Sequence, residues 1–143
     1  MKSLFPVFVV DHIIDARNFY VEYLGFKVVF EVDWYIQLHS ERVDEEPLEL
    51  AFISSNLEDQ HSSVRAGFSG DGVILTLDFE DVDAIYQELT ARNAVTEIVI
   101  DLKDEPWGQR HFMFRDPVGI LVDMVQAIAP SPEYDQGYSS QEK

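Results

Sequence analysis

The sequence predicts an α+β fold made of two βαβββ modules, whose curved sheets form a concave cavity. The expected order of elements, a strand, a helix and then three strands, occurs twice, at about residues 4–55 and 72–128. Neither copy is expected to bury its sheet face alone, so both are expected to form one domain over residues 1–128. The turn Asp116-Pro-Val-Gly119 lies between two apolar runs, which is typical of a β-hairpin.

The composition excludes several classes of partner. The chain has 143 residues, of which 46% are hydrophobic and 13% aromatic, which is enough for a sizeable core. Its net charge of −17 argues against binding to nucleic acid or to an anionic membrane. It suits a cationic ligand, although an acidic surface also simply keeps a protein soluble. There is no cysteine, signal peptide or apolar run of about 20 residues, which is compatible with a cytoplasmic location.

The first module is expected to begin with a strand over residues 4–10. Apolar residues then recur at helical spacing over residues 11–24, with Asp11 or Asp15 as the cap of the helix and Gly25 at its end. Three strands are expected to follow, over residues 26–32, 34–39 and 48–53.

A long loop over residues 54–72 is expected to precede the second module. A strand over residues 73–79 then leads to a helix that Asp81 caps. The core-facing side of this helix is expected to consist of Val82, Ile85, Tyr86 and Leu89. A strand over residues 95–102 and the hairpin complete the module, and residues 129–143 are expected to be a flexible tail.

Aromatic and charged side chains within these elements are candidates for ligand contact. Trp34, Tyr35 and Trp107 can stack on a flat ligand or attract a cation, with ordinary packing as the alternative. Asp123 interrupts an apolar run, so its carboxylate either faces water or lines a site that needs charge. The predicted ligand-binding residues are Trp34, Glu49, Thr76, Asp78, Trp107, Arg110, His111 and Asp123.

The four histidines lack the spacing of a metal-binding motif. Of these, His39 and His111 lie on expected strands, from which they can reach the cavity and transfer protons. A hydrogen-bonded strand histidine without a catalytic role is the alternative. We predict no catalytic residue.

Several motifs in combination resemble the vicinal oxygen chelate superfamily, which includes glyoxalase I, extradiol dioxygenases, and fosfomycin and bleomycin resistance proteins. The motifs are Phe19-Tyr20 followed by Leu24-Gly25-Phe26, and Phe114-Arg-Asp-Pro-Val-Gly119 leading to Val122-Asp123. The resemblance covers residues 4–127. The segment Glu105-Pro-Trp-Gly-Gln-Arg110 is most similar to the bleomycin-resistance branch, which implies a homodimer.

The resemblance also implies where a metal would bind. In metal-dependent members, four strand positions supply His or Glu ligands. The resemblance places these positions at Leu4 or Phe5, at Glu49, near Ile74 and at Asp123. Only two of the four carry a carboxylate, and two carboxylates make a poorly selective metal site. We therefore expect no cofactor.

Three functional hypotheses follow. The favoured one is a metal-free binding protein that sequesters a small cationic or aromatic molecule, such as a bleomycin-type antibiotic. The alternative is a lyase, isomerase or dioxygenase with a divalent metal at Glu49 and Asp123, completed by His39 or His111. The third is a protein whose cavity is vestigial and whose role lies in dimer contacts.

Overall fold

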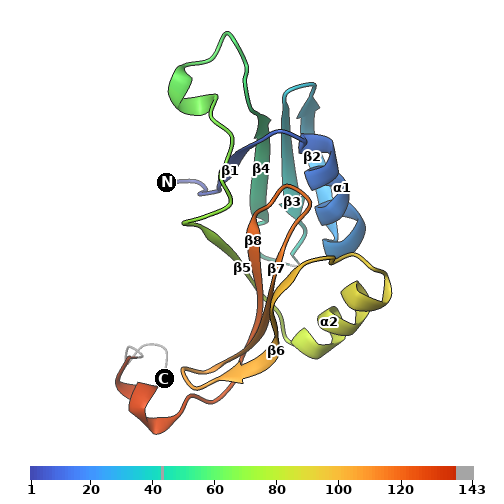
Figure 1. The fold of residues 1–143 in the computed structure, drawn as a ribbon. Coiled ribbons are helices and arrows are strands. Elements are labelled where there is room, and N and C mark those ends of the chain that lie inside the picture. Colours follow the sequence, from blue (N-terminus) through green and yellow to red (C-terminus); the bar gives the residue numbers. More distant parts are fainter. Residues whose placement is uncertain (43, 138–143) are drawn as a thin grey trace. The chain divides into compact units, whose positions relative to one another are not determined.

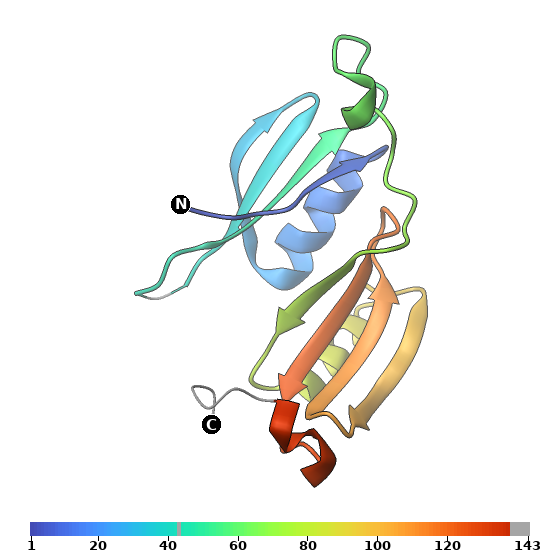
Figure 2. The same ribbon diagram turned by 90° about the vertical axis from the view of Figure 1, so that its left-hand side faces the viewer.

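The computed structural model describes residues 1–42 and 44–137, and the chain divides into two compact units. The first unit consists of Met1–Asp71 and Asp116–Ile120, and the second of Gly72–Arg115 and the chain from Leu121 onward. Each unit has a helix on one face of a four-stranded mixed sheet (Figures 1 and 2). The α+β class and the repeated element order are therefore confirmed, and the cavity between the sheets stays a prediction.

The first unit follows the predicted order of elements closely. They are β1 (Val7–Val10), α1 (Ile13–Leu24), β2 (Phe26–Val32), β3 (Tyr35–Ser40) and β4 (Leu48–Ser54). The sheet has the order β1-β4-β3-β2, in which β1 and β4 are parallel and the other neighbours antiparallel. Strand β1 begins later than expected, directly after Pro6, because proline has no N–H to donate to the ladder.

Helix α1 ends as predicted but begins differently. Gly25 has a φ of 72°, the left-handed conformation that commonly ends a helix. The helix starts after His12, which makes no side-chain cap hydrogen bond, so the expected capping by Asp11 or Asp15 is wrong. The Asp11 carboxylate instead accepts a hydrogen bond from the hydroxyl of Ser55.

The core of the first unit lies between α1 and its sheet. The ring centroid of Tyr20 lies 5.6 Å from that of Phe52 and 5.7 Å from that of Phe26. The side chain of Tyr20 is fully buried, and its hydroxyl donates to Oδ2 of Asp116 at 2.8 Å. Burial and the neighbouring Asp116 charge hold the pKa of the Tyr20 hydroxyl well above its usual range.

The Asp116 carboxylate also organises the turn in which it lies. Its Oδ1 accepts from the backbone N–H groups of Val118 and Ile120 at 3.0 and 2.9 Å. Gly119 supplies the positive φ of 88° that the turn requires. Burial raises the pKa of Asp116, whereas the bond from Tyr20 and those from the backbone oppose this rise. The predicted hairpin is confirmed, since paired strands flank this turn.

The second unit repeats the pattern of the first. Its elements are β5 (Ile74–Asp78), α2 (Val82–Ala91), β6 (Ile98–Glu105), β7 (Gln109–Arg115) and β8 (Leu121–Ala127), and its sheet has the order β5-β8-β7-β6. Asp81 caps α2 as predicted, since its carboxylate accepts from the N–H of Ala84 at 3.0 Å. Strand β6 begins later than expected, because Ala94 still donates to the carbonyl of Leu89 at the end of the helix.

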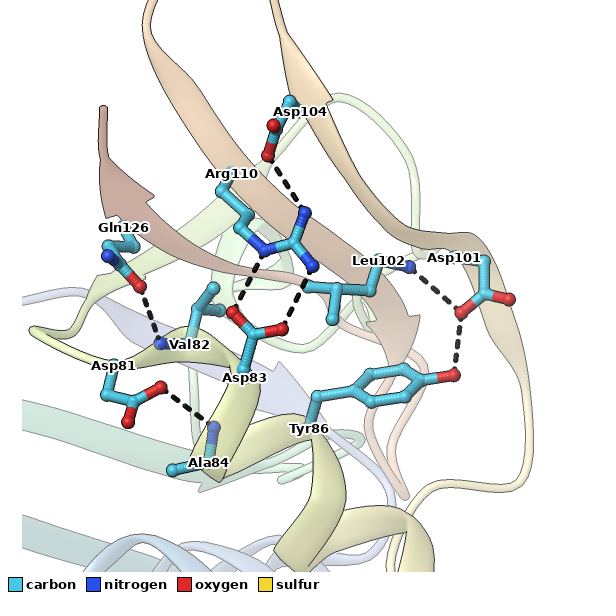
Figure 3. A network of polar contacts seen from close by, with 10 residues as sticks. All are labelled: Asp81, Val82, Asp83, Ala84, Tyr86, Asp101, Leu102, Asp104, Arg110 and Gln126. Carbon is cyan, nitrogen blue, oxygen red and sulfur yellow. Dashed lines mark hydrogen bonds and ion pairs between the residues drawn. The ribbon is translucent and has the colours of Figure 1, made fainter. Parts of the chain in front are cut away.

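Polar contacts attach α2 to β6 and β7 (Figure 3). The guanidinium of Arg110 donates to both carboxylate oxygens of Asp83 and to Oδ1 of Asp104, each at 2.9 Å. The hydroxyl of Tyr86 donates to Asp101 at 2.7 Å. The hydrogen bonds from Arg110 lower the pKa of Asp83, and that from Tyr86 lowers the pKa of Asp101.

These lowered pKa values predict that acid weakens the attachment of α2. A carboxylate whose pKa is lowered by folding contributes stability above its unfolded pKa, and loses it as the pH falls through the folded value. We expect Asp83→Asn to lower the free energy of unfolding in urea at pH 7, and this difference from wild type to shrink as the pH falls below about 3.9, the usual pKa of an aspartate. Asp59→Asn, in an exposed loop, serves as the control, and a difference for Asp83→Asn that persists in acid would contradict the explanation.

The described part of the expected tail contains a short helix, and the flexibility of the tail stays a prediction. Pro132–Gly137 forms a 3-10 helix, and the N–H of Ser131 donates to the carbonyl of Pro106 at 2.8 Å. These contacts fix the start of the tail to the β6–β7 turn, and the remainder of the expected tail, 138–143, lies outside the described residues. Across the described ranges, neither helix has the length and apolar character needed to cross a bilayer.

Candidate functional site

The second sheet has one face that packs against α2 and one that points away from it. The ring centroid of Phe112 on β7 lies 5.1 Å from that of Tyr86 on α2. Because side chains alternate along a strand, His111, the residue directly before Phe112, points away from the helix. Asp123 does so too, since Met124 is opposite Phe112 in the β7–β8 ladder. We call this face, and the equivalent one in the first unit, the distal face of each sheet.

The distal face of the second sheet brings together four of the predicted ligand-binding residues, Thr76, Asp78, His111 and Asp123. Thr76 is directly opposite Asp123 in the parallel ladder between β5 and β8. Thr76 and Asp78 are exposed, whereas His111 and Asp123 are buried. Arg110 is not part of this group, because its guanidinium points toward α2.

His111 is held between two carboxylates on this face. Its Nδ1 lies 2.8 Å from Oδ1 of Asp123, and its Nε2 lies 3.2 Å from Oε1 of Glu105. The hydrogen bond with His111 lowers the pKa of Glu105. Burial raises the pKa of Asp123, and the same histidine opposes that rise. Trp107 adjoins the cluster, with its ring centroid 6.4 Å from that of His111.

The two ring nitrogens of His111 have their partners within this cluster. Both imidazole nitrogens face carboxylate oxygens of the protein. Because these contacts occupy both nitrogens, a ligand or substrate would have to displace Asp123 or Glu105 to reach His111.

The distal face of the first sheet carries a similar but less complete pair. Phe52 packs against Tyr20 of α1, so its neighbours on β4 point away from that helix. Glu49 lies on this distal face, directly opposite His39 on β3. Nε2 of His39 lies 2.8 Å from Oε1 of Glu49, but without the angles of a hydrogen bond. The side chain of Glu49 is only 13% exposed.

Unpaired polar atoms concentrate at this pair. Among the described residues, the buried side-chain nitrogen and oxygen atoms without a hydrogen-bond partner are Nε2 of His39, Oε2 of Glu49 and Nε of Arg65. Buried polar atoms in folded proteins are nearly always hydrogen-bonded, so such a group calls for an explanation. Two of these three atoms thus belong to the His39–Glu49 pair.

Three aromatic rings accompany the pair. Tyr35 shares the distal face, and its ring centroid lies 6.0 Å from those of both Phe30 and Trp34. Phe30 and Trp34 are 52% and 44% exposed, which leaves ring surface accessible. The pKa of the Tyr35 hydroxyl is raised, first by burial and then by the charge of Glu49, which places that carboxylate within electrostatic reach of the ring cluster.

Phe30 is a site residue that the sequence analysis missed. Simple alternation from the buried Phe26 places it on the face toward α1. A β-bulge between Val28 and Phe30 shifts the register, so that Phe30 is opposite Gln37 and joins the distal face. No pattern in the sequence predicts this bulge.

Comparison with known families identifies the fold. A sequence model of the Glyoxalase/Bleomycin resistance protein/Dioxygenase superfamily matches residues 4–124. The chain belongs to this superfamily. Among curated proteins, none matches the sequence.

Solved structures of the superfamily share the fold at low sequence identity. A member from Sphaerobacter thermophilus DSM 20745 is 24% identical with a TM-score of 0.67, and the match covers 88% of this chain and 97% of that one. TnmS3, an antibiotic binding protein from Streptomyces sp. CB03234, is 23% identical with a TM-score of 0.61, covering 86% and 93%. A lactoylglutathione lyase from Agrobacterium tumefaciens is 18% identical with a TM-score of 0.66, covering 87% and 92%.

At the positions where metal-dependent members of the superfamily bind their ion, this chain has few side chains that can act as metal ligands. Leu4 lies outside β1, and Thr76 rather than Ile74 is opposite Asp123. In the described part of the chain, no three His, Asp or Glu side chains are grouped so that they could hold a metal ion. Because the donor set does not fit a metal, we derive no metal-assisted step, and the metal content stays a prediction.

Proposed function

We propose that this chain binds a small organic molecule that is cationic or aromatic and sequesters it without transforming it. The observation that carries the proposal is the distal face of the first sheet, which carries three aromatic rings and the largely buried Glu49. Exposed rings offer flat surfaces for stacking and attract cations through their π faces. A sheltered carboxylate attracts a cation more strongly than an exposed one, because solvent ions screen it less.

Two further observations favour this class of ligand. The net charge of −17 raises the local concentration of cations around the whole protein. TnmS3, which shares the fold, is an antibiotic binding protein. A bleomycin-type antibiotic, which is both cationic and aromatic, is the named example that we put forward.

The test is a thermal-unfolding titration with bleomycin, together with metal analysis of the purified protein. A ligand at 100 times its dissociation constant stabilises the native state by about 2.7 kcal/mol, so specific binding raises the melting temperature measurably. We expect such a rise with metal-free protein, and a smaller one in the variant Trp34→Ala. A stoichiometric transition metal that is lost in Glu49→Ala or Asp123→Ala would overturn the proposal in favour of an enzyme.

The proposal includes a homodimer that acts in the cytoplasm. The superfamily resemblance of the Glu105–Arg110 segment supports the dimer. Sedimentation analysis at micromolar concentration is expected to give twice the mass of the chain, and a monomer would contradict this part alone.

A further inference from the structure

We propose that the ring cluster of Phe30, Trp34 and Tyr35 is a binding site for a quaternary ammonium group, such as a trimethylammonium. This inference rests on the proposed function and narrows its ligand class. It distinguishes a cation without N–H groups, which aromatic faces can hold, from a primary ammonium, which is equally charged but depends on hydrogen bonds.

The hairpin between β2 and β3 holds the three rings together. Val32 is directly opposite Tyr35, so the turn between the strands has only two residues. Trp34 is the second of them and directly precedes Tyr35. The β-bulge in β2 brings Phe30 to the same face of the sheet as Tyr35. One hairpin therefore supplies the whole cluster, and the site needs no other part of the chain.

The faces of these rings are not covered by one another. The plane of Tyr35 is inclined at 61° to that of Phe30 and at 62° to that of Trp34, with centroids 6.0 Å apart in each pair. A parallel stack would cover one face of each ring, whereas inclined rings leave their faces accessible. Phe30 and Trp34 are exposed as well, so a ligand can reach them from solvent.

The charges around the cluster suit a cation. The pKa of the Tyr35 hydroxyl is raised first by burial and then by the charge of Glu49, so a negative charge acts on the cluster. The lysine of β2 does not provide the counter-ion, because the ammonium of Lys27 lies 2.6 Å from Oε1 of Glu41, beyond the opposite end of β3. The net charge of −17 favours an external cation further.

The chemistry of aromatic rings favours a quaternary ammonium over a primary one. A primary ammonium is strongly hydrated, and ring carbons cannot replace the hydrogen bonds that it makes with water. The methyl groups of a trimethylammonium have no such bonds to lose, and they bury apolar surface against the rings while the positive charge is attracted by the π faces. A neutral group of the same shape gains the apolar contribution alone.

The experiment compares three small probes with the full chain at pH 7 and constant ionic strength. They are choline, ethanolamine, which has a primary ammonium on the same chain, and 3,3-dimethylbutan-1-ol, which is the neutral carbon analogue of choline. Binding at millimolar concentrations is followed by the two indole N–H signals in the ¹H–¹⁵N NMR spectrum, assigned with Trp34→Phe. Trp34 reports on the cluster, and Trp107 in the second unit serves as the internal control.

Two matched variants test whether the aromatic face itself is required. Phe30→Leu removes one ring of the cluster but keeps an apolar side chain. Phe68→Leu makes the same change against Phe8 on β1, at the opposite edge of the sheet from β2. We expect Phe30→Leu to lose most of the preference for choline and Phe68→Leu to retain it.

We expect choline to bind about 5-fold more tightly than either other probe, with shifts of Trp34 and not of Trp107. Equal binding of choline and 3,3-dimethylbutan-1-ol would show an apolar patch without cation selectivity and would overturn the inference. Ethanolamine binding as tightly as choline, or no shift of Trp34 with any probe, would overturn it too. The proposed function is decided separately, by the thermal-unfolding titration with bleomycin.

Discussion

Replacing Asp116 by alanine is expected to destabilise the protein by about 3 to 5 kcal/mol. The carboxylate accepts from the buried hydroxyl of Tyr20 and from the backbone N–H groups of Val118 and Ile120, so the substitution leaves two buried donors and one part-buried donor without a partner. Urea unfolding monitored by circular dichroism measures the loss. Because single domains are stable by only about 5 to 15 kcal/mol, such a variant is close to unfolding at room temperature.

Two matched variants separate the contributions at this turn. Asp116→Asn keeps an acceptor for the backbone N–H groups of Val118 and Ile120, so its loss is expected to be less than half that of Asp116→Ala. Tyr20→Phe removes a single hydrogen bond and is expected to destabilise by about 1 to 2 kcal/mol. A loss below about 1 kcal/mol for Asp116→Ala would show that water replaces the carboxylate without difficulty.

Replacing His111 by leucine is expected to destabilise the protein by about 3 kcal/mol at pH 7. The buried imidazole is the hydrogen-bond partner of Asp123, and its removal leaves that carboxylate buried without this partner and near Glu105. A carboxylate in such a position has a folded-state pKa above its unfolded value. The penalty therefore grows as the pH rises through the folded pKa and is absent below the unfolded one.

The pH dependence is what distinguishes this explanation from simple loss of packing. The difference in the free energy of unfolding between wild type and His111→Leu is expected to be large at pH 7 and to shrink toward about pH 4. The double variant His111→Leu, Asp123→Leu is expected to recover much of the loss, because it removes the carboxylate as well. A difference that is the same at both pH values, with no recovery in the double variant, would point to packing alone.

Sequence reasoning predicted the elements well where a local pattern determines them. The helical spacing of Val82 and Leu89, the cap at Asp81 and the glycine at position 25 each act within a few residues, and all three are confirmed. The start of α1 was wrong, because Asp11 bonds with Ser55 far along the chain instead of with its own helix. Such tertiary contacts compete with local capping. They cannot be predicted from a short window of sequence, because the partner lies far along the chain.

The candidate site was less predictable, because strand register decides it. Glu49 was identified as a binding candidate, but its position opposite His39 depends on the connection between β3 and β4. The pairing of His111 with Asp123 was easier to predict from the sequence, since the Asp116–Gly119 turn sets the β7–β8 register. Arg110 was chosen for its charge, and only the alternation along β7 shows that it points toward α2.

The division of the chain also has a consequence for the order in which the protein folds during synthesis. The first unit includes Asp116–Ile120, so the acceptor for the Tyr20 hydroxyl is encoded after almost all of the second unit. At about 5 to 20 residues per second, a ribosome needs about 2 to 9 seconds to add residues 72–115. For that interval the nascent first half holds an incomplete core. A chain truncated after Asp71 is permanently in this state and becomes a natural target for chaperones and proteases.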